Sequence, residues 1–150
     1  MPNRLDADRL PLPSALGGLC RAFGLDAIYV FGSRAMEVAA AARLGRPLDV
    51  DAGSDIDVGV LPRAVTRIDA RERARLTMAL ETALSGARVD LVLLPEAPPF
   101  LALDIVAGEL LVAVDRDRVA EYELFVLRRA GDLAPFERER RRLLLGGGAR

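Results

Sequence analysis

The spacing of hydrophobic residues divides the chain into strands and helices. Short apolar runs bounded by turn residues predict strands at 26–33, 55–61 and 87–96. Apolar residues that recur every three or four positions predict helices. These helices span 14–24, 34–45, 69–85, 99–108 and 116–133, and a last one follows at 135–145. The segment 109–115 fits either a short strand or the continuation of a helix. Strands separated by helices predict a small α/β (α+β) fold, with a mixed sheet of three to four strands covered by helices and with helices at the C-terminus.

The chain is expected to form one domain spanning 1–150, because 150 residues is an ordinary domain length and no repeat or linker divides it. Residues 1–13 and 146–150 are expected to be flexible. Cys20 is the only cysteine and has no partner for a disulfide, so it is expected in the core of a protein from a reducing, cytoplasmic compartment.

The longest apolar tract, 97–114, does not fit a membrane span. Asp104, Glu109 and two prolines interrupt it. The N-terminus also lacks the apolar core of a signal peptide. We therefore expect no membrane association.

Histidine and lysine are absent, and their absence excludes many kinds of catalysis. The chain has no histidine, and all 21 of its basic residues are arginine. Imidazole acid–base chemistry, serine–histidine catalysis, a lysine Schiff base and a Walker-A lysine are therefore excluded. Carboxylates, hydroxyls, backbone amides and arginine remain, and carboxylates favour Mg²⁺ or Mn²⁺. The net charge of −1 gives no general attraction to nucleic acid.

Two aspartates stand at the start of the strand in "GSDIDVGVL" (53–61). Asp55 and Asp57 are two residues apart, which in a strand places them on one face at a separation of roughly 6.5 Å. Like charges this close repel each other, and burial strengthens the repulsion. The pair needs a compensating partner.

Three features of the chain are expected to meet at one place. Gly32 and Ser33 close one strand and open a helix, where free N–H groups attract an anion such as phosphate. Asp55 and Asp57 follow on the next strand, and Asp90 begins the third. Three neighbouring carboxylates are compatible if a cation lies among them. Two such metals would orient a triphosphate for an in-line displacement.

These segments resemble a known family. "FGSRA", "SDIDVGVL" and "VDLVLL" are similar to the nucleotidyltransferase fold of the DNA polymerase beta superfamily. More narrowly, they resemble the minimal nucleotidyltransferases (MNT) that act as antitoxins beside HEPN-domain ribonuclease toxins, in type VII-like toxin–antitoxin pairs. The resemblance covers roughly 14–140 and includes the tail "DRVAEYELFVLRRAGDLAP".

The resemblance implies that the protein binds Mg²⁺–ATP and transfers AMP to a tyrosine of its cognate HEPN toxin, which inactivates the toxin in a hetero-oligomer. Gly32 and Ser33 would hold the nucleotide phosphates. Asp55 and Asp57 would bind the metal, and Asp90 would bind metal and help deprotonate the acceptor hydroxyl. Arg34 fits either a phosphate contact or a solvated side chain.

The chain departs from the family pattern in one place. More residues separate Gly-Ser from the first aspartate than the resemblance implies, and we interpret 34–53 as an insertion between the two motifs. Its alanine-rich helix has little apolar bulk, so we expect it at the surface beside the nucleotide entrance. Alternatively, the insertion displaces the phosphate-binding turn from the metals.

Two other functions stay open. The protein could be a non-catalytic antitoxin that masks its toxin by binding. It could also be a nucleotidyltransferase that modifies a small molecule. The small size favours a protein acceptor over a small one, because no second domain is present to bind the latter.

Overall fold

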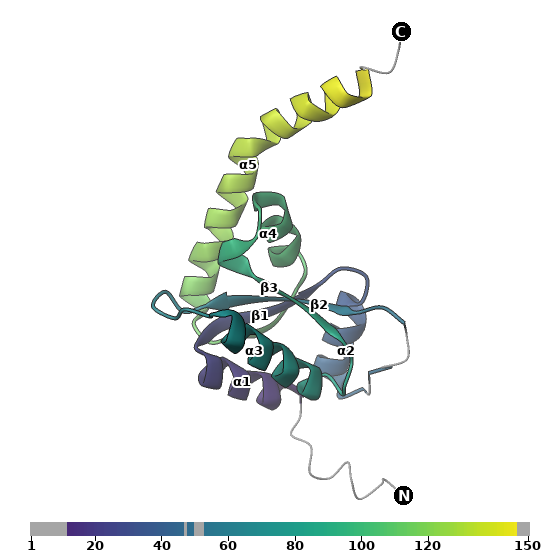
Figure 1. Ribbon diagram of the computed structural model, residues 1–150, viewed down its shortest axis with the longest axis vertical. Coiled ribbons are helices and arrows are strands. Elements are labelled where there is room, and N and C mark those ends of the chain that lie inside the picture. Colours follow the sequence, from purple (N-terminus) through teal and green to yellow (C-terminus); the bar gives the residue numbers. More distant parts are fainter. Residues whose placement is uncertain (1–11, 47, 50–52, 147–150) are drawn as a thin grey trace, which may run out of the picture.

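The computed structural model describes residues 12–46, 48–49 and 53–146, and a four-stranded sheet lies at the centre of this part (Figure 1). The strand order is β3-β2-β1-β4. The strands are β1 (Leu25–Phe31), β2 (Ile56–Pro62), β3 (Val89–Leu93) and β4 (Glu109–Ala113). β1 pairs antiparallel with β2 and β4, whereas β2 and β3 are parallel. The predicted mixed sheet is confirmed, and 109–115 contains its edge strand.

Helices cover both faces of the sheet (Figure 1). They are α1 (Leu12–Phe23), α2 (Ala35–Leu44), α3 (Ala70–Ala83), α4 (Pro99–Val106) and α5 (Arg116–Gly146), with a short 3-10 helix, η1 (Leu94–Glu96). α1, α2 and α3 pack on one face, and α4 and α5 pack on the other. α3 begins at an aspartate cap, since the Asp69 carboxylate accepts a hydrogen bond from the Glu72 N–H at 2.8 Å.

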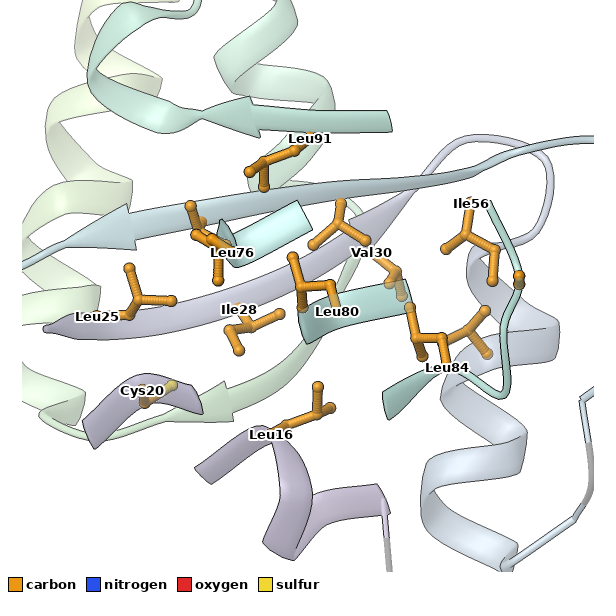
Figure 2. Packing of buried hydrophobic residues seen from close by; sticks show 14 of the residues in the cluster. Leu16, Cys20, Leu25, Ile28, Val30, Ile56, Leu76, Leu80, Leu84 and Leu91 are labelled. Carbon is orange, nitrogen blue, oxygen red and sulfur yellow. The ribbon is translucent and has the colours of Figure 1, made fainter. Parts of the chain in front are cut away.

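The alternation of side chains along β2 assigns its residues to the two faces. Ile56, Val58 and Val60 are buried in the core beneath α1 and α3. Figure 2 shows Ile56 and Val30 in this core, facing Leu80 of α3 and its neighbours. Asp57 and Gly59 alternate with the buried set and therefore lie on the face of α4 and α5.

Cys20 belongs to the same core, as expected. Burial raises the pKa of its thiol to about 11, so it stays protonated at neutral pH.

The second core lies between the sheet and the pair α4–α5. Tyr29 of β1 is buried there, and its hydroxyl donates a hydrogen bond of 2.6 Å to the Glu123 carboxylate on α5. Gly59 allows α4 to approach the sheet closely, because a Cβ at this position would lie 2.4 Å from Cγ2 of Ile105. α4 is thereby held directly above β2.

The structure corrects the expectation for the alanine-rich helix. Val38, Ala39 and Ala41 of α2 are buried, so this helix is part of the core and does not lie loosely on the surface. Its side chains are small, and α2 therefore packs closely against its neighbours. The predicted end at Gly45 is confirmed, since Gly45 has a left-handed φ of 64°. Of the proposed insertion 34–53, residues 47 and 50–52 lie outside the described residues.

The C-terminal region is one helix and not two. α5 runs from Arg116 to Gly146 with Pro135 inside it, and Figure 1 shows it bending and extending past α4. Val119 and Val126 are buried in the core between the sheet and α4–α5, whereas Leu133 is exposed. In the part of the chain that is described, no helix is both long and apolar enough to cross a membrane.

The expected flexible ends fall mostly outside the described residues, at 1–11 and 147–150. The remaining three residues of those ends, 12, 13 and 146, are helical.

Candidate active site

The turn after β1 is shaped by a glycine. β1 ends at Phe31, and Gly32 follows with a φ of 75°, a left-handed conformation that residues with a Cβ adopt at a cost. The turn reverses the chain so that α2 starts at Ala35, whose N–H donates to the Gly32 carbonyl at 3.3 Å. Ser33 is exposed at this corner. The predicted strand–turn–helix around Gly32 and Ser33 is confirmed.

Asp57 and Asp90 are direct neighbours across the sheet. They are paired residues in the parallel ladder of β2 and β3, and Asp57 is also paired with Phe31 of β1. Adjacent strands are roughly 5 Å apart, and paired residues point to the same face. The Gly32 turn, Asp57 and Asp90 therefore lie side by side at one end of the sheet.

Asp55 occupies a different position from the other two acids. It precedes β2 and is exposed. The ladder begins one residue later, where the Ile56 N–H donates to the Arg88 carbonyl at 2.8 Å.

A cavity of about 740 Å³ opens in front of Asp57 and Asp90, on the face of α4. Four carboxylates line it: Asp57 and Asp90 from the sheet, Asp104 from α4, and Glu109 at the start of β4. The remaining lining residues are Phe31, Gly32, Ala35, Met36, Val92, Leu101, Ala107 and Gly108. None of these residues is basic, and Asp55 is not among them. The cavity is thus acidic, and a polyphosphate would need cations to enter it.

The negative charge of Asp57, at the centre of the cavity, is disfavoured by its surroundings. The pKa of the Asp57 carboxyl is raised above its ordinary value, because burial disfavours its charged form and the charges of Asp90 and Asp55 lie nearby. A Cβ at Gly32 would lie 2.3 Å from Oδ2 of Asp57, so the glycine leaves room for this carboxylate.

The carboxylates fit a hard divalent cation by their chemistry and by this repulsion. Among the described residues, however, no three histidine, cysteine or acidic side chains lie close enough to hold one ion. The described side chains thus offer Asp57 and Asp90 as neighbours, and a cation would need further oxygens, such as those of a bound phosphate.

The sequence analysis missed Asp104 and Glu109 as cavity residues and noted them only as interruptions of an apolar tract. Glu109 accepts a hydrogen bond of 2.8 Å from Nη2 of Arg43, which lies on α2. No local pattern indicates that α4 and the start of β4 fold back over the sheet.

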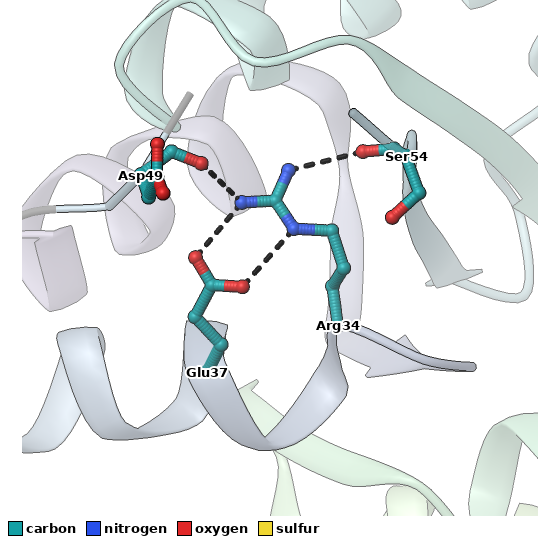
Figure 3. A network of polar contacts seen from close by, with 4 residues as sticks. All are labelled: Arg34, Glu37, Asp49 and Ser54. Carbon is teal, nitrogen blue, oxygen red and sulfur yellow. Dashed lines mark hydrogen bonds and ion pairs between the residues drawn. The ribbon is translucent and has the colours of Figure 1, made fainter. Parts of the chain in front are cut away.

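Arg34 fits neither of the two expectations for it. Its side chain is buried and does not line the cavity. Figure 3 shows its guanidinium enclosed by Glu37, Asp49 and Ser54.

The family model described as polymerase beta, nucleotidyltransferase matches residues 19–117. The match includes the Gly32 turn, β2 with its aspartates, and Asp90. The chain therefore belongs to the polymerase beta nucleotidyltransferase family.

Solved structures of toxin–antitoxin complexes contain chains similar to this one. A chain of a tri-AMPylated HEPN toxin–MNT antitoxin complex from Shewanella oneidensis is 26% identical, with a TM-score of 0.58, and the match covers 92% of this chain and 97% of that chain. A toxin–antitoxin complex with AMP-PNP contains a chain with 26% identity and a TM-score of 0.61, with 91% of this chain and 98% of that chain covered. A MntA–HepT complex gives 26% identity, a TM-score of 0.58, and coverages of 92% and 97%.

These matches identify an MNT-type nucleotidyltransferase. No curated protein matches the chain.

Proposed function

We propose that this protein is the antitoxin of a toxin–antitoxin pair and inactivates a HEPN ribonuclease toxin by transferring AMP from ATP to a tyrosine of that toxin. One observation supports catalysis most directly: Asp57 and Asp90 are paired across β2 and β3, beside the Gly32 turn and in front of a cavity. A protein that only masked its toxin would have no need for this costly pair of like charges.

The residues have separate roles in this proposal. The backbone at Gly32 and the hydroxyl of Ser33 hold the phosphates of ATP. Asp57 and Asp90 would hold Mg²⁺ or Mn²⁺, and Asp55, whose charge acts on Asp57, would contribute a further oxygen. Such a cation would supply positive charge against the phosphates and against the charge that develops during transfer.

The proposed transfer step uses these residues as follows. The tyrosine oxygen attacks the α-phosphorus of ATP, the bond from that phosphorus to the bridging oxygen breaks, and pyrophosphate leaves. The hydroxyl proton goes to Asp90, because a tyrosine with a reference pKa of about 10 is a poor nucleophile while protonated. A positioned base typically contributes 10²–10⁴-fold in rate.

The relatives support both the nucleotide and the partner. One complex contains AMP-PNP, and another contains a tri-AMPylated HEPN toxin. Each match covers more than nine-tenths of this chain and of the matched chain. The similarity therefore extends over most of the chain.

Intact-mass analysis of the partner tests the proposal. The protein is co-expressed with the product of the neighbouring gene, and the toxin is then purified and weighed. We expect a gain of whole adenylate units together with relief of toxicity. Asp57→Asn with Asp90→Asn should abolish the mass gain, whereas Asp69→Asn, which alters only the cap of α3, should retain it.

Two outcomes would contradict the proposal. If the double variant relieves toxicity as well as the unaltered protein and the toxin never gains mass, the protein masks its toxin by binding. If the toxin is never modified but Mg²⁺–ATP is consumed with a small hydroxyl or amine acceptor, the substrate is a small molecule.

A further inference from the structure

The buried Arg34 joins the two signature motifs of the site. It directly follows Gly32-Ser33 and is 6% exposed. Its Nη1 donates a hydrogen bond of 3.0 Å to the carbonyl of Ser54, the residue directly before Asp55. One side chain thus connects the turn that faces the phosphates to the segment that leads into β2 (Figure 3).

Most of the donors of Arg34 are occupied by groups of the protein itself. Nε and Nη2 form a bidentate pair with the Glu37 carboxylate, at 3.1 and 2.8 Å. Nη2 also donates to the Asp49 carbonyl, and Nη1 to Ser54. All three nitrogens of the guanidinium are therefore engaged in a charge-assisted network. Arg34 is not free to bind a phosphate.

The two carbonyls belong to a segment without regular structure. Residues 48–49 and 53–55 are neither helix nor strand. Asp55 has fixed neighbours on both sides: the Ser54 carbonyl accepts from Arg34, and the Ile56 N–H donates to Arg88 at 2.8 Å. The sheet fixes Asp57 and Asp90, but the position of Asp55 depends on Arg34 as well.

We propose that Arg34, oriented by Glu37, is a positioning residue that sets where Asp55 stands relative to Asp57 and to the Gly32 turn. This inference rests on the proposed function for the role of Asp55. We call Arg34 and its hydrogen bonds to Glu37, Asp49 and Ser54 the clamp. The clamp connects both ends of the long segment between the motifs, which makes that segment compatible with an ordered site.

The planar shape of the guanidinium is essential to this role. It donates to a carboxylate and to two carbonyls in different directions at once, whereas a lysine ammonium is a point charge on a flexible stem. The pKa of Glu37 is lowered from its ordinary value, first by its hydrogen bonds to Arg34, which agrees with a tightly bound pair.

The test measures how much Mg²⁺ is needed for ATP binding, by calorimetry at a series of Mg²⁺ concentrations. Removing a group that orients metal ligands typically costs 10–100-fold in metal affinity, so we expect Arg34→Gln to raise the Mg²⁺ midpoint by about tenfold or more. Arg34→Lys should also raise the Mg²⁺ midpoint, because lysine keeps the positive charge but lacks the planar guanidinium that donates in several directions. Glu37→Gln should give a smaller rise of the same kind.

Val38→Ala is the matched control. Val38 is fully buried on the same helix, and it contacts Arg34 through its backbone N–H, which donates to the Arg34 carbonyl at 3.1 Å. Alanine keeps this backbone bond, so the truncation should lower stability and leave the hydrogen bonds of the Arg34 guanidinium in place. The Mg²⁺ midpoint of this variant should be unchanged. Hydrogen exchange of the backbone amides over 53–56 gives a second readout, and it should accelerate in Arg34→Gln but not in Val38→Ala.

The outcomes separate the inference from the proposed function. If the unaltered protein binds no Mg²⁺–ATP, the proposed function fails. If it binds normally and Arg34→Gln or Arg34→Lys shows an unchanged midpoint, Arg34 only stabilises the fold and the positioning role is wrong. A midpoint that rises equally in Val38→Ala would lead to the same conclusion.

Discussion

Replacing Gly32 by alanine tests the proposed site at its tightest contact. Gly32 has a φ of 75°, and a left-handed conformation costs a residue with a Cβ about 1–2 kcal/mol. The new Cβ would also lie 2.3 Å from Oδ2 of Asp57, whereas real contacts of this kind are essentially never below 3.0 Å. Oδ2 must therefore move away from the new Cβ. The Cγ and Cβ of Asp57 would lie 3.3 and 3.6 Å from the new Cβ and need not move far, so the carboxylate oxygen takes up most of the displacement.

This displacement should reduce catalysis more than stability. A misplacement on the order of 1 Å at a reacting centre costs about 10²-fold in rate, so we expect Gly32→Ala to lose roughly that factor in AMP transfer. The loss of 1–2 kcal/mol in unfolding free energy should lower the melting temperature by about 2–4 °C per kcal/mol. Thermal unfolding followed by circular dichroism and single-turnover transfer to the toxin measure the two effects.

Gly45→Ala supplies the comparison. Gly45 has a φ of 64°, and a Cβ there would meet nothing within 4 Å. This variant should lose a similar 1–2 kcal/mol and keep its full transfer rate. If the two variants transfer AMP equally well, the closeness of Gly32 to Asp57 has no catalytic meaning and the assignment of this site is wrong.

Three further predictions concern the acids and the second core. Asp57→Asn should stabilise the metal-free protein at neutral pH. The pKa of Asp57 is raised in the folded state, so its charged form destabilises the fold as pH rises through that pKa. In thermal melts with EDTA, the gain in stability should vanish below about pH 3.8, where the carboxyl is protonated in both the folded and the unfolded state. Asp90→Asn should retain much of the Mg²⁺–ATP affinity but lose transfer by roughly 10²-fold or more; near-normal single-turnover transfer would rule out Asp90 as the base. Tyr29→Phe should lose about 1.5 kcal/mol with the bond to the Glu123 carboxylate, and unchanged ATP binding is expected because Tyr29 does not line the cavity. Equal urea midpoints for Tyr29→Phe and the unaltered protein would show that this bond adds nothing.

The sequence predicted those parts of the fold and the site that follow from local patterns. Alternation along β2 correctly separated Ile56 and Val58 from Asp57, and the glycine at 32 marked the turn. Local chemistry determines these two features, so a single chain was enough to infer them. The expectation that Asp90 meets Asp57 assumed in addition that their strands are neighbours, and the pairing of β2 with β3 in the structure agrees with that assumption.

Other features depend on how distant segments meet, and the sequence did not predict them. The alanine-rich α2 was expected at the surface because it lacks bulk, yet its small side chains are what allow close packing against the sheet. Pro135 was expected to begin a new helix, but α5 continues through it. The clamp of Arg34 requires carbonyls from a loop with no regular structure, which no periodicity can reveal.

The parallel pairing of β2 with β3 has a consequence for the order in which the protein is made. Parallel strands need a crossover between them, and here α3 forms it. A growing chain can pair β1 with β2 early, but Asp90 joins Asp57 only after the crossover has been synthesised and has closed, and Asp104 and Glu109 follow later still. We expect ribosome-bound chains arrested before β3 to bind no nucleotide, so that nucleotide binding arises late in synthesis, after most of the chain has been made.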